Sequence, residues 1–205
     1  MYRILDLYEE ECQEKYPVVC MDEKMCQLLG ETRKSIPLKE GSIAKYDYEY
    51  KRNGTANIFV AVEPKAGKHL ISVTERRTKK DFALFIRKIA DEIYPEAKKI
   101  RMVLDNLNTH FEKSFYETFT KAEAERILKR IEFYYTPKHA SWLNIAEIEI
   151  NILGIECLDR KIESMEKLTK EVTAWELEKN MDQKKIYWTF TKAKADEKMS
   201  KYYVA

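Results

Sequence analysis

The chain has few glycines, prolines and cysteines, and it has no long apolar run. Its 205 residues include only five glycines and five prolines, which favours long regular elements. Its four cysteines show no CxxC spacing and its three histidines are isolated, so neither a disulfide framework nor a zinc site is expected. No apolar run approaches the roughly 18 residues of a membrane span, and the N-terminus lacks the basic and apolar regions of a signal peptide. We therefore expect a protein of the cytoplasm.

An excess of charge of one sign is also missing, because 37 basic and 35 acidic residues give a net charge of only +2. The charges are nevertheless unevenly spread. Residues 1–23 are rich in acids, whereas residues 65–88 and 184–201 are rich in bases. Solvated lysines on helix faces are the simpler explanation of the basic segments, and a patch for a polyanion is the alternative.

Apolar runs and amphipathic stretches are well represented, since 44% of the residues are hydrophobic and 12% are aromatic. The runs predict five strands, at residues 17–22, 56–62, 69–74, 100–105 and 131–135. The amphipathic stretches predict helices at residues 3–12, 79–93, 112–129, 143–158, 164–181 and 191–202. No linker rich in Gly, Ser or Pro divides the chain. This order predicts one α/β domain with a mixed sheet flanked by helices.

Three acids stand at positions where chemistry is expected. Two predicted strands end in Asp22 and Asp105, and the carboxyl ends of neighbouring strands could bring both within reach of one Mg²⁺ ion. Either aspartate alone is more simply explained as a turn former. Glu147 lies near the start of a predicted helix, where the helix dipole favours an acid. It is surrounded by apolar positions, however, so a buried carboxylate there would need a partner.

The segments around these acids form an ordered set of motifs. They are residues 19–23, 48–57, 73–78, 105–110, 135–149, 157–160 and 187–190. In this order they closely resemble the catalytic domain of DDE transposases, in the bacterial insertion-sequence branch of the mariner superfamily. The resemblance covers nearly the whole chain.

The resemblance implies a ribonuclease-H-like fold with a mixed five-stranded sheet. It also implies that Asp22, Asp105 and Glu147 are catalytic acids that bind two Mg²⁺ ions, for which Mn²⁺ can substitute. Glu149 is the alternative third acid; Glu147 is preferred because it follows Asn144 by three residues, as the family's motif requires. The implied activity is that of a DNA endonuclease and strand transferase. Such an enzyme cleaves transposon ends and joins the 3′-hydroxyl to target DNA.

Further polar residues complete the expected site. Candidates for supporting the acids from behind are Asn106, Asn108, His110 and Asn144. Candidates for contacts with DNA phosphates are Arg33, Lys34, Lys51, Arg52, Arg76, Arg77, Lys79, Lys80 and Lys138. A cap or surface role is an equal alternative for His110, and Trp142 is more simply a core residue than a base-stacking one.

The length also bears on organisation. Only about twenty residues precede Asp22, too few for the helix-turn-helix modules that family members carry before the catalytic domain. We expect residues 1–205 to form a single catalytic domain with a C-terminal helical extension, from a split or truncated element or as an excised domain. We expect it to associate with the nucleoid, to bind double-stranded DNA as a homodimer, and to work with a separately encoded helix-turn-helix subunit.

Two alternatives to a transposase remain open on the sequence. The first is a ribonuclease-H-like hydrolytic nuclease that does not join DNA, and the second is a catalytically idle DNA-binding remnant. The presence of all three acids disfavours the remnant, and a strand-transfer assay separates the transposase from the nuclease.

Overall fold

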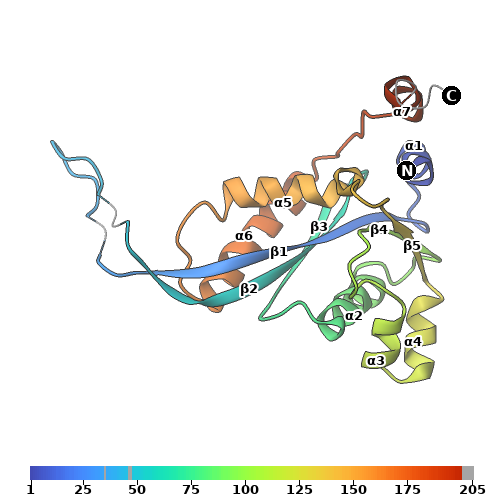
Figure 1. Ribbon diagram of the computed structural model, residues 1–205, viewed down its shortest axis with the longest axis horizontal. Coiled ribbons are helices and arrows are strands. Elements are labelled where there is room, and N and C mark those ends of the chain that lie inside the picture. Colours follow the sequence, from blue (N-terminus) through green and yellow to red (C-terminus); the bar gives the residue numbers. More distant parts are fainter. Residues whose placement is uncertain (35, 46–47, 200–205) are drawn as a thin grey trace.

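A mixed five-stranded sheet forms the centre of the computed structural model, which describes residues 1–34, 36–45 and 48–199. The strands are β1 (Val18–Glu31), β2 (Tyr50–Glu63), β3 (Lys68–Thr74), β4 (Ile100–Leu104) and β5 (Ile131–Tyr135), and their order across the sheet is β3-β2-β1-β4-β5. The first three strands pair antiparallel, whereas β1, β4 and β5 pair parallel (Figure 1). The expected α/β domain with a mixed five-stranded sheet is therefore confirmed.

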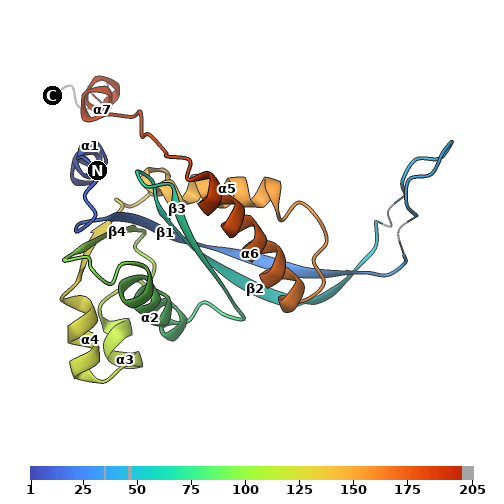
Figure 2. The ribbon, with the colours of Figure 1, turned by 180° about the vertical axis from the view of Figure 1, so that it is seen from behind.

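Helices cover both faces of this sheet (Figures 1 and 2). One face carries α1 (Tyr2–Glu9), α5 (Ile145–Glu156) and α6 (Met165–Asp182); the other carries α2 (Lys79–Lys88), its π-helical continuation Ile89–Ile93, α3 (Lys113–Thr118) and α4 (Lys121–Leu128). The last helix, α7 (Lys192–Met199), contacts α1. No helix in the described part of the chain is long and apolar enough to cross a membrane.

Alternation along β2 divides the core into separate layers. Phe59 joins Phe82 and Phe115 on the α2 face, whereas its neighbour Ile58 packs with Leu153 on the α5 face. Successive side chains of a strand point to opposite faces, so a continuous apolar run such as residues 58–62 serves both layers. A strand of this kind is held firmly on both sides and is a rigid base for functional groups.

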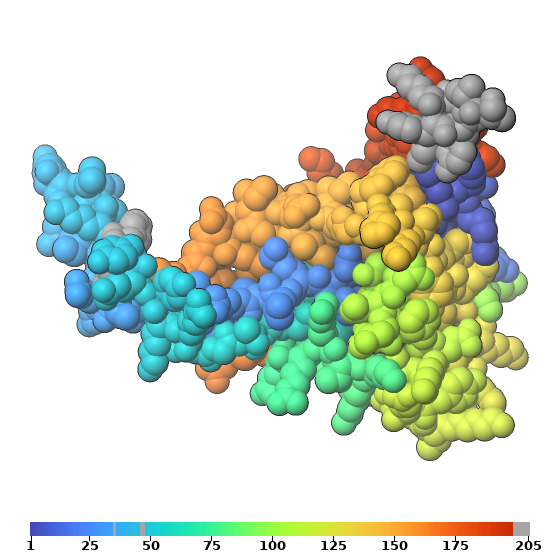
Figure 3. Space-filling model, in the orientation of Figure 1, coloured from blue at the N-terminus to red at the C-terminus, as the bar shows by residue number. Residues whose placement is uncertain are grey.

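Two strands are much longer than the sequence predicted. β1 continues past residue 22 to Glu31, and β2 begins at Tyr50 instead of residue 56. The two strands stay paired as far as Glu31 opposite Tyr50, and with the described residues between them they form an arm that extends far from the body (Figure 3). The prediction failed there because most of the arm's residues are exposed, so no alternation between apolar and polar positions marks it.

Helix boundaries differ from the prediction where side chains cap the helix ends. The expected helix at residues 112–129 is two helices, because the Thr120 hydroxyl accepts from the Glu123 backbone N–H and starts α4 anew. α5 begins at Ile145 instead of residue 143, since Asn144 caps it after a 3₁₀ turn at Ser141–Leu143. Of the expected helix at 191–202, residues 200–202 lie outside the described part of the chain.

Candidate active site

Asp22 and Asp105 come level with each other where the parallel pairing of β1 and β4 ends. The last pair of that ladder is Cys20 with Val103, so the same register two residues further on brings Asp22 beside Asp105. The expectation that a strand ends at Asp22 is wrong, since β1 runs on in its pairing with β2. The aspartates meet because only the ladder to β4 ends there.

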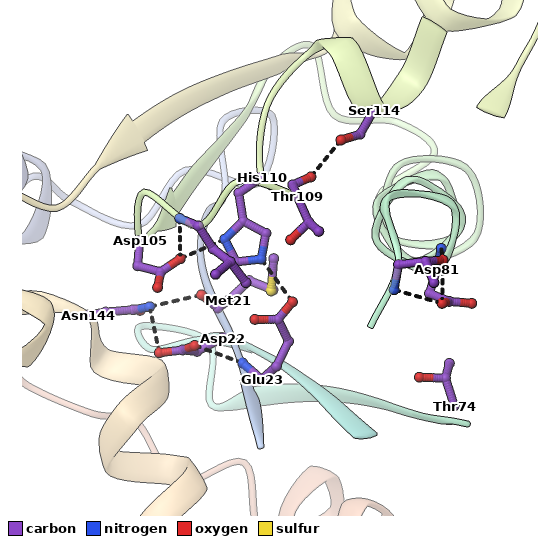
Figure 4. A network of polar contacts seen from close by, with 12 residues as sticks. Met21, Asp22, Glu23, Thr74, Asp81, Asp105, Thr109, His110, Ser114 and Asn144 are labelled. Carbon is purple, nitrogen blue, oxygen red and sulfur yellow. Dashed lines mark hydrogen bonds and ion pairs between the residues drawn. The ribbon is translucent and has the colours of Figure 1, made fainter. Parts of the chain in front are cut away.

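The third acid comes from α5, which is fastened to β1 beside Asp22. The buried Asn144 side chain donates through Nδ2 to the Met21 carbonyl at 2.8 Å and to Asp22 Oδ2 at 3.5 Å, while its Oδ1 caps the helix (Figure 4). Glu147 lies in the first turn of this helix. Asn144 therefore contacts Asp22 and caps the helix on which Glu147 lies, within electrostatic range of Asp22.

Burial and the neighbouring acids disfavour the charged form of Asp22. Burial raises the pKa of Asp22 to about 7, and the charges of Asp105, Glu23 and Glu147 add to this increase against the opposing hydrogen bond from the Glu23 backbone N–H. Within the described residues, no three His, Cys, Asp or Glu side chains stand close enough to hold an ion as they lie. A bound cation would offset the negative charges that surround Asp22.

A buried histidine joins Asp105 to a fourth acid. His110 has no solvent exposure, and its ring nitrogens lie 2.7 Å from Asp105 Oδ1 and 2.9 Å from Glu23 Oε1 (Figure 4). Burial lowers the pKa of His110, but the hydrogen bonds to both carboxylates outweigh it and raise the pKa to about 9. For the carboxylate of Asp105, burial has the opposite effect and raises the pKa. The hydrogen bond and the charge of His110 outweigh burial and hold the pKa of Asp105 below its usual value. His110 thus supports the acids and is not a surface residue.

Sequence reasoning overlooked Glu23, although a signal for it was present. It follows Asp22 directly on a strand, so its side chain must point to the opposite face of the sheet. That face carries α2 and a hydrophobic core, and the Glu23 side chain is only 3% exposed. An acid at a core-facing position needs a partner, and the histidine in the motif at residues 105–110 supplies it.

Glu149, the alternative third acid, faces away from the other acids. It is 5% exposed and its Oε2 lies 2.8 Å from Nε2 of His69 on β3, which itself packs edge-on against Trp175 of α6. The pair joins three elements inside the core. This placement supports Glu147 as the third acid of the site and gives Glu149 a structural role.

Replacing Glu149 with glutamine is expected to destabilise the protein by about 1–3 kcal/mol, because it disturbs a buried hydrogen bond to His69. Urea unfolding followed by circular dichroism measures the loss, with the exposed Glu166→Gln on α6 as control. A Glu149→Gln protein as stable as the control would contradict this structural role.

Other candidate residues lie further from the acids. The Asn106 side chain turns away and donates to the Thr136 carbonyl, and Asn108 is exposed on the same loop. Trp142 is 43% exposed and packs edge-on against Phe190 at 5.3 Å, so its expected place in the core is wrong. Of the four residues proposed to support the acids, His110 and Asn144 contact them directly.

The candidate DNA-binding residues do not form one patch. Arg76 and Arg77 are exposed on the loop between β3 and α2, and the charge of Arg77 helps lower the pKa of Asp105. Lys79 starts α2 and is paired with Glu117 at 2.8 Å. Lys80 and Lys138 are exposed beside these segments, on α2 and on the loop after β5. The remaining candidates lie on the arm, away from the acids; they are Arg33, Lys34, Lys51 and Arg52.

A mixed five-stranded sheet with two acids where the pairing of two neighbouring parallel strands ends, and a third acid at the start of a helix beside them, is the arrangement of a ribonuclease-H-like domain. The chain belongs to the DDE superfamily endonuclease family, whose model matches residues 17–169. This membership confirms the family that the motifs predicted, and it includes Asp22, Asp105 and Glu147 in the matched region.

Solved structures show the same fold. The chain is similar to the Mos1 mariner paired-end complex with Mg (TM-score 0.57, 14% identity, 98% of this chain and 59% of that one). It is also similar to the paired-end complex with Mn (TM-score 0.56, 15% identity, 89% of this chain and 54% of that one). The chain therefore spans little more than half of these proteins. No curated protein matches the sequence. The ribonuclease-H-like fold is confirmed.

Proposed function

We propose that this chain is the catalytic domain of a transposase, which cleaves DNA phosphodiesters at transposon ends and joins the 3′-hydroxyl to target DNA. The observation that carries the proposal is that Asp22 and Asp105 come level where the β1–β4 ladder ends, with Glu147 within electrostatic range of Asp22, in a chain of the DDE endonuclease family. The relatives solved with Mn and Mg support divalent cations as cofactors.

The residues of the site fit a pair of Mg²⁺ ions, with Mn²⁺ as a substitute. Asp22, Asp105 and Glu147 offer only oxygen ligands, which Mg²⁺ prefers. The raised pKa of Asp22 reflects burial first and the neighbouring negative charges second, and a cation would balance those charges. Such ions supply an activated water and stabilise the leaving oxygen in phosphodiester cleavage. The chain itself holds the carboxylates on a rigid sheet, while Asn144 fixes α5 against β1.

DNA and a second copy of the chain are the partners we propose. The similar structures are described as paired-end complexes, which supports a dimer acting on two DNA ends. The arm adds support, because apolar side chains such as Leu38 and Ile43 are 74% and 75% exposed on it. Recognition of the transposon ends is left, in this proposal, to a helix-turn-helix part encoded separately.

A single assay separates the proposed function from its alternatives. Pre-cleaved DNA ends are incubated with target plasmid and Mg²⁺, and joined products are resolved from nicked ones on gels. Joined products are expected from the transposase, nicks without joining from a hydrolytic nuclease, and DNA binding without either product from an idle remnant. Only the first outcome supports the proposal.

Arg77→Ala is expected to weaken DNA binding uniformly across sequences and to reduce the slope of log K against log salt by about 1. The reason is that Arg77 is exposed close to Asp105, where a phosphate of bound DNA would lie. Fluorescence anisotropy with duplexes of unrelated sequence at several salt concentrations measures the slope. Lys170→Ala, on the exposed side of α6, is the control; equal slopes for both variants would remove Arg77 from the DNA-binding surface.

A further inference from the structure

Asp105 differs from an ordinary surface carboxylate in that one of its oxygens is fully engaged. Its Oδ1 accepts from the Leu107 backbone N–H at 3.1 Å and faces Nδ1 of His110 at 2.7 Å. Within the described part of the chain, no hydrogen bond reaches Oδ2. The carboxylate is thus held by one oxygen and presents the other.

The group that holds Asp105 is itself immobilised on all sides. The His110 ring packs on Phe82 with centroids 4.8 Å apart, and its carbonyl accepts from the Tyr135 hydroxyl at 2.7 Å. Its second nitrogen, Nε2, lies 2.9 Å from Glu23 Oε1, and the Glu23 side chain is 3% exposed. A ring with a carboxylate at each nitrogen can satisfy both only by donating from both. The imidazole can therefore neither flip nor rotate away without breaking a buried hydrogen bond.

Glu23 connects this arrangement to the first metal-site acid. It follows Asp22 on β1, so the two side chains leave opposite faces of the same strand. Its backbone N–H also donates to Asp22 Oδ1 at 2.8 Å. One short piece of β1 therefore supplies Asp22 to the site directly and reaches Asp105 from behind through His110 (Figure 4).

We propose that Glu23 and His110 are positioning residues, which hold Asp105 by Oδ1 so that Oδ2 is presented to a divalent cation. The inference rests on the proposed function, since it takes Asp105 to be a metal ligand. It adds Glu23 to the site, and it explains why both residues are buried behind Asp105: they fix the orientation of a ligand that would otherwise rotate about its side-chain bonds. Partners of this kind behind a metal ligand typically contribute about 10- to 100-fold in metal affinity.

The test measures Mn²⁺ binding directly, by electron paramagnetic resonance of free Mn²⁺ in titrations of the protein without DNA. His110→Ala is expected to weaken the affinity by about 10- to 100-fold, and Glu23→Gln by about 10-fold. Glu23→Gln keeps the shape and an acceptor for His110 but removes the charge, so it covers the case in which His110→Ala does not fold. Glu166→Gln removes an exposed carboxylate from α6 and is expected to bind Mn²⁺ like the wild type.

A second readout separates positioning from general stability. The Mn²⁺ concentration that gives half-maximal DNA nicking is expected to be higher for His110→Ala and for Glu23→Gln than for the wild type. A variant that merely unfolds more easily would lose nicking at saturating Mn²⁺ with no such rise, and that result overturns the inference, as does unchanged Mn²⁺ affinity. The failure of the proposed function gives a different result: Asp105→Asn would then bind Mn²⁺ as the wild type does, or the wild type would not bind Mn²⁺ at all. The two failures are therefore distinguishable.

Discussion

Asp105→Asn is expected to reduce Mg²⁺-dependent DNA cleavage by about 10³-fold or more. Asparagine keeps the size of the side chain and can still contact His110, but it removes the negative charge that a cation requires. Metal ions in such sites contribute several kcal/mol of transition-state stabilisation, and each step of about 1.4 kcal/mol corresponds to a factor of ten in rate. Nicking of supercoiled plasmid at saturating Mg²⁺, with the rate taken from single-turnover time courses, measures the loss.

The matched control is Asp159→Asn, which removes an aspartate from an exposed position after α5. It is expected to cleave DNA at the wild-type rate. Equal rates for Asp105→Asn and the wild type would exclude Asp105 from catalysis and with it the proposed arrangement of acids. If both substitutions reduced the rate equally, the loss would follow from the change in net charge and not from the site. The site geometry does not predict that result.

The sequence predicted the elements whose side chains face the core and missed those whose side chains do not. The strand at residues 131–135 was placed at its observed bounds, and the strand beginning at Ile100 was placed to within one residue. The outer part of the β1–β2 arm was missed, because pairing between the strands extends it well beyond its few buried side chains, such as Leu28. Caps such as Thr120 shifted boundaries for a similar reason: a single side-chain hydrogen bond outweighs the periodicity of the flanking residues.

The sequence predicted the acids of the site but not the contacts around them. Asp22, Asp105 and Glu147 were identified through motifs, and pairing between β1 and β4 explains how the two aspartates meet. The environment of each acid could not be read from the chain. Whether Glu149 faces the site or the core depends on the rotation of α5, and only the contact with His69 decides it. Glu23 was missed because its importance depends on His110, which lies 87 positions away in the sequence.

Asp22→Asn is expected to stabilise the metal-free protein at pH 8 while abolishing stabilisation by Mg²⁺. Burial, helped by the neighbouring acids, raises the pKa of Asp22 to about 7, from about 4 for an ordinary aspartate. A raised carboxyl pKa means that the folded state is favoured when Asp22 is protonated. Its contribution to stability is complete below about pH 4 and is lost as the pH rises through 7. At pH 8 the charge costs about 2–4 kcal/mol, which asparagine avoids.

Thermal unfolding in EDTA checks the first half of this expectation, with a rise in Tm of about 5–10 °C over the wild type at pH 8 that shrinks toward pH 4. Asp159→Asn should show no such gap. Mg²⁺ checks the second half: the wild type gains stability because the ion binds only the folded state, by about 2.7 kcal/mol at 100 times Kd, and Asp22→Asn does not. A variant that is no more stable at pH 8 would show that Asp22 carries no buried charge, and an unchanged Mg²⁺ response would show that the ions bind elsewhere. Both results together would mean that the chain retains the three acids but lacks the buried negative charge that a bound metal ion would balance.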